Sequence, residues 1–133
     1  GRRTCLLEVK SVTLVEDGVA LFPDAPTVRG RTHIEHLIAA RTRGVRAAIL
    51  FVIQRADVSA FAPNRLADPE FSKSLRRAFR AGVRVQAMAC QVRPSGVRLD
   101  RPVPVRWDAT PRSAVGNRRS AECVGTTTAR ERQ

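Results

Sequence analysis

A glutamate and a lysine two positions apart, Glu8 and Lys10, have the spacing in this sequence that best suits chemistry. Residues two apart on a β-strand point to the same face, so the carboxylate and the ammonium group would project side by side. The other residues of that face, Leu6, Val12 and Leu14, are apolar. Charges in such a setting must be paired, bound to a metal or placed beside water. The pattern therefore predicts either a structural ion pair along the strand or a catalytic pair.

The catalytic alternative has a definite chemistry. The carboxylate of Glu8 would hold a hard divalent cation such as Mg²⁺ through oxygen. Lys10 would orient a water molecule and stabilise the charge that develops on a phosphate. An E-x-K sequence is also the last part of the signature of many metal-dependent nucleases of the restriction-endonuclease-like type.

The first half of the chain predicts elements that would position this pair. β-Branched residues predict a strand over 4–15, and Asp17-Gly18 predicts a turn into a short strand over 19–22. A helix follows that ends at Gly44, with Thr27 or Thr32 as its N-cap; Thr32 is followed three residues later by a glutamate, as in a capping box.

In the second half, residues 45–54 are apolar on both faces, which is typical of a central strand covered on each side. We expect a loop over 55–66 and then a helix with Asp68 as its N-cap, whose buried stripe includes Phe79. Further strands are predicted over 83–92, 97–99 and 103–107. This alternation of strands and helices favours an α/β layered domain with a mixed, partly parallel central sheet flanked by helices.

Charge indicates a polyanionic partner. The 133 residues include 24 Lys+Arg and 12 Asp+Glu, a formal net charge of +12. Residues 1–107 hold 19 basic and nine acidic residues, so most of the excess lies in the part that is predicted to fold. Nucleic acid, contacted mainly through phosphates, is the expected partner of such a domain, and an anionic membrane surface is the second possibility. The alternative is a composition bias, because 22 of the 24 basic residues are arginine.

Other features narrow the class of protein. No apolar run approaches the roughly 20 residues that span a bilayer, so a membrane protein is not expected. Three cysteines without a CxxC pair favour reduced thiols in the cytoplasm. Residues 108–133 are polar and are expected to form a disordered tail after a domain over 1–107.

Residues 8–14 (EVKSVTL) resemble the E-V-K-[NS]-V-T-L motif of the sugar fermentation stimulation proteins of bacteria and archaea. The resemblance continues through residues 21–27 (LFPDAPT), Arg29-Gly30 and His33, and extends over roughly 4–106. It implies a DNA-binding protein that regulates sugar metabolism, notably maltose use. It also implies a protein with an N-terminal OB-like domain followed by a domain of restriction-endonuclease-like fold. This chain would hold only the nuclease-like domain.

The same resemblance assigns roles to individual residues. It makes Glu8 and Lys10 the E-x-K pair, with Glu8 as ligand of a Mg²⁺ ion in the intact protein, and places Lys10, Asp24, Arg29 and His33 against nucleic acid. From the residues alone, Asp24 is equally a turn former, and His33 a surface or capping histidine.

Two functions from different classes remain. One is a DNA-binding regulatory module that does not cut. The other is the partial catalytic domain of a metal-dependent nuclease. The family's upstream acidic residue would precede the first residue of this chain, so we expect the chain on its own to be inactive as a nuclease.

Overall fold

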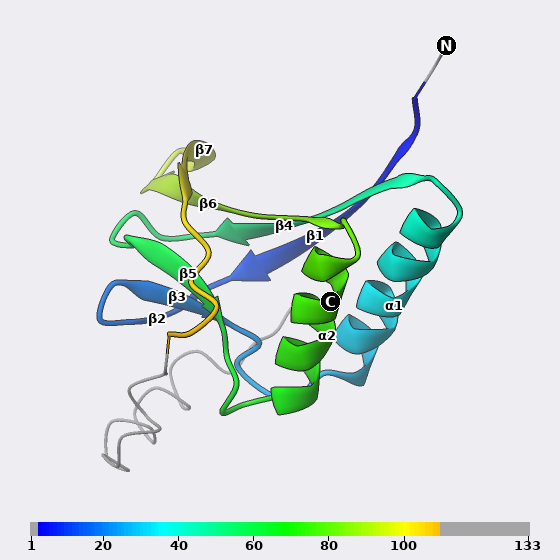
Figure 1. Ribbon diagram of the computed structural model, residues 1–133. Coiled ribbons are helices and arrows are strands. Elements are labelled where there is room, and N and C mark those ends of the chain that lie inside the picture. The colour runs from blue at the N-terminus through cyan, green and yellow to red at the C-terminus, as the bar shows by residue number, and fades with distance from the viewer. Residues whose placement is uncertain (1–2, 110–133) are drawn as a thin grey trace.

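The computed structural model describes residues 3–109, which form two β-sheets and two α-helices (Figure 1). The elements, in chain order, are β1 (Cys5–Val12), β2 (Leu14–Glu16), β3 (Val19–Phe22), α1 (Val28–Thr42), β4 (Arg46–Ile53), β5 (Ala60–Pro63), α2 (Pro69–Arg80), β6 (Arg84–Arg93) and β7 (Gly96–Val103).

The larger sheet has the strand order β1-β4-β6-β7. Strands β1, β4 and β6 run parallel, and β7 pairs with β6 in the antiparallel direction. Strand β4 is central, as its continuous apolar run predicts. The prediction of an α/β domain with a mixed, partly parallel sheet is therefore confirmed.

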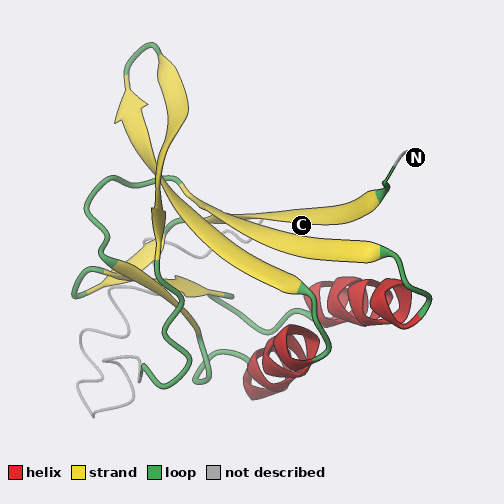
Figure 2. Ribbon diagram, turned by 45° about the horizontal axis from the view of Figure 1, so that its top comes forward, coloured by secondary structure: helices red, strands yellow, loops and turns green. Residues whose placement is uncertain are grey.

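The helices do not flank this sheet on both sides. Figure 2 shows α1 and α2 side by side against one face of it. Ile49 and Phe51 of β4 face the helices and are fully buried with Ile34 and Leu75. On the opposite face, Val9 of β1 is half-exposed.

A second sheet, of order β2-β3-β5, departs from the sequence-based expectation. The strand predicted over 4–15 is divided at Thr13, so that Leu14 belongs to this second sheet. Asp17 and Gly18, both with positive φ, form the predicted turn into β3. The predicted loop over 55–66 contains β5, which pairs in parallel with β3. The strand predicted over 103–107 is reduced to the end of β7 and a single bridge between Val105 and Phe61.

Both helices begin at side-chain caps. Thr27 is the N-cap of α1, because its Oγ1 accepts a hydrogen bond from the Gly30 N–H at 2.9 Å. Thr32, the other candidate, lies inside the helix, where its hydroxyl donates to the carbonyl of Val28. Asp68 is the N-cap of α2, as predicted.

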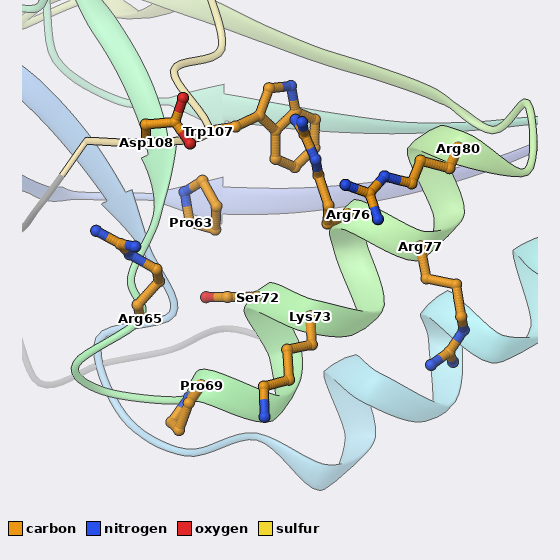
Figure 3. Close-up of a pocket in the computed structure, with 10 residues that line it drawn as sticks. All are labelled: Pro63, Arg65, Pro69, Ser72, Lys73, Arg76, Arg77, Arg80, Trp107 and Asp108. Carbon is orange, nitrogen blue, oxygen red and sulfur yellow. The ribbon is translucent and has the colours of Figure 1, made fainter.

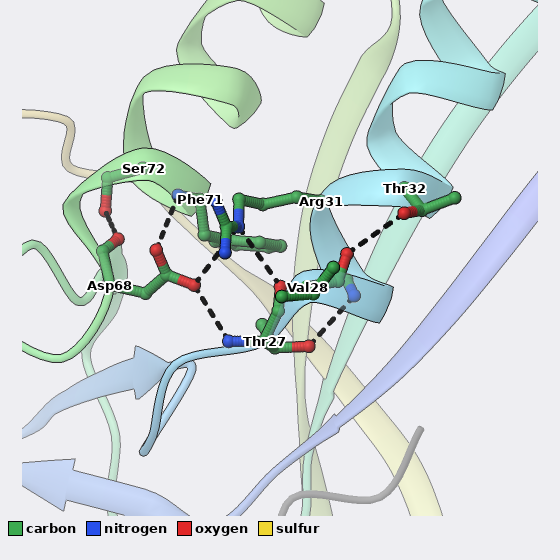
Figure 4. Close-up of polar contacts among 8 residues, drawn as sticks. Thr27, Val28, Arg31, Thr32, Asp68, Phe71 and Ser72 are labelled. Carbon is green, nitrogen blue, oxygen red and sulfur yellow. Dashed lines mark hydrogen bonds and ion pairs between the residues drawn. The ribbon is translucent and has the colours of Figure 1, made fainter.

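Asp68 also joins the two helix starts (Figure 4). Its Oδ1 accepts from the Phe71 N–H at 3.0 Å, while its Oδ2 accepts from the Thr27 N–H at 2.9 Å. Arg31 lies 3.8 Å from the same Oδ2. One buried carboxylate thus fixes how α1 and α2 start relative to each other, and α1 carries part of the site described next.

The remaining expectations concern the surface and the tail. Phe79 is 47% exposed and contacts Trp107, so the prediction that it belongs to the buried stripe of α2 is wrong. No helix within residues 3–109 has the length and apolarity needed to cross a membrane. The predicted disordered tail lies almost wholly outside the described residues.

Candidate functional site

Glu8 and Lys10 lie on the face of β1 that packs toward α1, and His33 of α1 lies opposite them. The Lys10 Nζ lies 2.8 Å from the His33 Nδ1 and 3.5 Å from the Glu8 Oε1. The Glu8 Oε1 is 3.0 Å from the same His33 Nδ1. The three side chains therefore form one compact cluster, which we call the Glu8–Lys10–His33 cluster.

Burial differs sharply within the cluster. Lys10 is 1% exposed, whereas Glu8 and His33 keep 31% and 22% of their side-chain surface in solvent. A buried ammonium group is tolerated only with hydrogen-bond partners and a compensating charge. Glu8 supplies the compensating charge, and His33 supplies a hydrogen-bond acceptor. The ion pair between Glu8 and Lys10 that the strand pattern predicts is therefore present.

The protonation of His33 follows from its surroundings. Burial lowers the pKa of His33, as do the charges of Lys10, Arg29 and His36, while Glu8 acts in the opposite direction. A neutral imidazole can accept a hydrogen bond from the Lys10 ammonium at Nδ1. Because Nδ1 cannot accept from Lys10 and donate to Glu8 at once, we assign the neutral form and treat Glu8 as the partner of Lys10.

Arg29 lies next to the cluster, and Asp24 lies at the carboxyl end of β1. Arg29 is exposed in the first turn of α1, one turn before His33, and is close enough to lower the pKa of that histidine. Asp24 is half-buried and lines a small hollow with Ser11 and Thr13, at the carboxyl end of β1. The structure thus groups the predicted site residues around one end of β1 and the start of α1.

The residues present do not complete a site for Mg²⁺. This ion takes six ligands in near-octahedral geometry, preferably oxygens. Within residues 3–109, no group of three or more His, Cys, Asp or Glu side chains is placed to hold a metal. Glu8 is a suitable ligand on its own, and its assignment to a metal stays a prediction.

The contact between His33 and Lys10 is the feature that residue patterns alone did not predict. The strand period placed Glu8 with Lys10, but the helix pattern indicated only a surface or capping role for His33. Arg29 and His33 are four residues apart and therefore share a helix face. This spacing is the one sequence signal that could have placed Arg29 and His33 at the same site. Which face of α1 meets the strand is decided by the packing of α1 on β1.

The fold and the cluster define a class: a basic α/β domain in which a buried lysine on a parallel strand pairs with a glutamate two residues before it. The family model described as "Sugar fermentation stimulation protein RE domain" matches residues 1–96. The chain belongs to the sugar fermentation stimulation protein family.

Curated relatives support this membership. The chain is 56% identical over 105 residues to the sugar fermentation stimulation protein homolog of Chloroflexus aurantiacus, covering 79% of this chain and 40% of that protein. It is 51% identical over 106 residues to the homolog of Moorella thermoacetica, covering 80% and 46% respectively. The chain therefore spans less than half the length of these relatives.

A solved structure agrees with the fold. The structure of Pyrococcus furiosus SfsA in complex with Ca²⁺ superposes with a TM-score of 0.73 and 35% sequence identity. The match covers 77% of this chain and 45% of that one. The mixed α/β arrangement is thus shared with a member of the same family.

Proposed function

We propose that this chain is a DNA-binding module of a sugar fermentation stimulation protein, acting in the cytoplasm on genes of sugar metabolism such as those for maltose use. The observation that carries the proposal is the excess of 19 basic over nine acidic residues within 1–107. A folded domain of this charge attracts the phosphate backbone of nucleic acid. Arg29 is exposed beside the cluster and would contact phosphate directly. Lys10, Asp24 and His33 would line the same nucleic-acid-binding region.

The test is the salt dependence of DNA binding. Gel-shift or anisotropy titrations of the 133-residue chain with duplex DNA should give an affinity that falls linearly with salt on a log–log plot, with a slope of about −0.9 per phosphate contact. Replacing Arg29 with alanine should reduce the slope by about one, as expected for one lost phosphate contact. Affinity that does not depend on salt, or no retention at low salt, would overturn the proposal.

A second candidate function is a metal-dependent phosphodiesterase with a restriction-endonuclease-like layout. Two observations favour it: the Glu8–Lys10 pair on one strand face, and the Ca²⁺ complex of the Pyrococcus furiosus relative. In that role Glu8 would be a ligand of Mg²⁺ and Lys10 would stabilise charge on the scissile phosphate.

Plasmid nicking separates the two candidates. Supercoiled DNA would be incubated with Mg²⁺ or Mn²⁺ and the chain extended by the upstream segment that carries the family's acidic residue, alongside the Glu8→Gln and Lys10→Met variants of this extended chain. Nicking by the unmodified chain that both variants lose would establish the enzyme. Salt-sensitive binding without nicking in any of the three would establish the binding module.

A further inference from the structure

A groove separate from the Glu8–Lys10–His33 cluster lies between α2, the end of β5 and the segment that follows β7 (Figure 3). It has a volume of about 490 Å³ and shares no residue with that cluster. We call it the α2 groove, and it is lined by Pro63, Arg65, Pro69, Ser72, Lys73, Arg76, Arg77, Arg80, Trp107 and Asp108. Its volume is within the range of pockets that hold small molecules or parts of larger ones.

The lining of the α2 groove is strongly cationic. Five of its residues are Arg or Lys, and one is acidic. Arg77 is engaged elsewhere, since it turns toward α1 and pairs with Glu35. Within residues 3–109, neither Arg76 nor Arg80 forms an ion pair with a carboxylate. Their charges are therefore available to an anion that enters the groove.

Aromatic rings position one of these arginines. The guanidinium carbon of Arg76 lies 4.9 Å from the ring centroid of Trp107 and 6.0 Å from that of Phe79. The two rings contact each other, with centroids 5.1 Å apart. A guanidinium stacked in this way keeps its edge N–H groups for a ligand and loses less freedom when it binds. This contact also gives a reason for Phe79 to stay at the surface.

The spacing of the cations suits a chain of phosphates better than a single one. Lys73, Arg76 and Arg80 follow one another at intervals of three and four residues, so they lie along the same side of α2. Seven residues of helix rise about 10 Å. One DNA strand has a phosphate about every 3.4 Å along its axis, so about three fall within that length.

Lys73 would have to exchange its present partner. It lies 3.5 Å from Glu70, but both side chains are largely exposed. Exposed pairs of this kind add little stability and are readily replaced. A phosphate that approaches from the groove can therefore compete with Glu70.

We infer that the α2 groove binds the phosphate backbone of DNA, with Arg76 and Arg80 as its main contacts. The inference rests on the proposed DNA-binding function and adds to it a surface that the predicted site residues do not include. Trp107 would sit at that surface, and it is the single tryptophan of the chain. Its fluorescence therefore reports on the groove alone.

The experiment combines this fluorescence with paired substitutions in the 133-residue chain. Duplex DNA should change the Trp107 emission with the same midpoint as binding measured by anisotropy of labelled DNA. The Arg76→Ala/Arg80→Ala variant should weaken binding about ten-fold at moderate salt and reduce the log–log salt slope by about two. The control, Arg46→Ala/Arg84→Ala, removes equal charge from exposed positions at the starts of β4 and β6 and should keep the slope. Circular dichroism would confirm that both variants fold.

Each other outcome has a distinct meaning. If the chain binds DNA but both double variants weaken binding equally, the groove assignment is wrong and the proposed function stands. If the unmodified chain binds no DNA, both fail together. If inorganic phosphate alone produces the full change in Trp107 emission at concentrations comparable to those of DNA phosphate, the groove is a single-phosphate site and the inference is overturned.

Discussion

The ammonium nitrogen of Lys10 lies 2.8 Å from Nδ1 of His33, across the contact between β1 and α1. This hydrogen bond gives a buried lysine a partner from another element, while Glu8 on its own strand balances the charge. The contact joins the helix and the strand at the point where the predicted site residues gather.

Stability should depend on pH through His33. Its pKa is lowered in the folded chain, first by burial and then by Lys10, so the unfolded chain binds more protons near and below pH 6.5. The contribution of His33 to the free energy of unfolding should therefore be complete above about pH 6.5. It should decrease as the pH falls through the lowered pKa of the folded chain. Urea titrations from pH 7.5 to 5 would measure this.

The control for that prediction is the neighbouring histidine. His33→Asn should flatten the pH dependence, whereas His36→Asn should leave most of it in place. An equal flattening by both variants would show that the dependence does not arise in the Glu8–Lys10–His33 cluster.

Substitutions at Lys10 should show whether the volume of its side chain or its charge stabilises the packing of β1 on α1. Lys10→Ala leaves a cavity and removes the partner of His33, and should cost about 2–5 kcal/mol, as large-to-small changes in cores do. Lys10→Met keeps the volume and removes a buried charge, so its cost should be within about 1.5 kcal/mol of zero. Denaturant unfolding checks both. A Met variant as unstable as the Ala variant would mean that the ammonium group itself holds β1 to α1.

Asp68 should matter more than an ordinary N-cap. Asp68→Ala removes the cap of α2 and leaves the Thr27 N–H without its acceptor. A lost cap costs about 1 kcal/mol and a buried donor without a partner about 1–3 kcal/mol, so we expect about 2–4 kcal/mol in all. Thr32→Ala, at the rejected cap position, should change stability by less than about 0.5 kcal/mol in the same urea titration.

Gly30 should resist the substitution that helix propensity favours. Alanine is preferred over glycine in a helix by about 1 kcal/mol. At position 30, however, a Cβ atom would lie 2.8 Å from Thr27 Cγ2 and 3.2 Å from Phe71 Cε2. We expect Gly30→Ala to destabilise the chain by about 1–2 kcal/mol, since overpacking outweighs propensity. A rise in melting temperature would show that Thr27 and Phe71 can move apart without loss.

Local signals predicted the elements that depend on local chemistry. Asp68, followed by a proline at the first helical position, predicted the start of α2, and the apolar run predicted the central strand β4 within one residue at each end. The short strand β5 carried no such signal, because it ends in Pro63 and its partner β3 lies far back in the chain. Phe79 followed the apolar period of its helix, yet Trp107 from a later segment provides its contact.

The candidate site was also predictable only in part from local sequence patterns. The strand period alone predicted that Glu8 and Lys10 share a face, and the structure brings their charged atoms to 3.5 Å. The contact between Lys10 and His33 depends on which face of α1 packs on β1. That packing is a feature of the tertiary structure, so local sequence patterns do not predict it. The α2 groove was even less predictable from the sequence. Arg76 and Trp107 are distant in sequence and meet only because the segment after β7 returns to α2.

The parallel pairings of the fold also set its order of assembly. Cys5 pairs opposite Arg46 and Val19 opposite Ala60, so both sheets are closed between segments about 40 residues apart. Hairpins such as β6–β7 close in microseconds, whereas pairings of long range must first bear the entropy of closing a loop. We therefore expect folding on the millisecond-to-second scale that is typical of non-local topologies. Lys10 and His33 are 23 residues apart, so their contact closes a shorter loop than the β1–β4 pairing and can form before that pairing is complete.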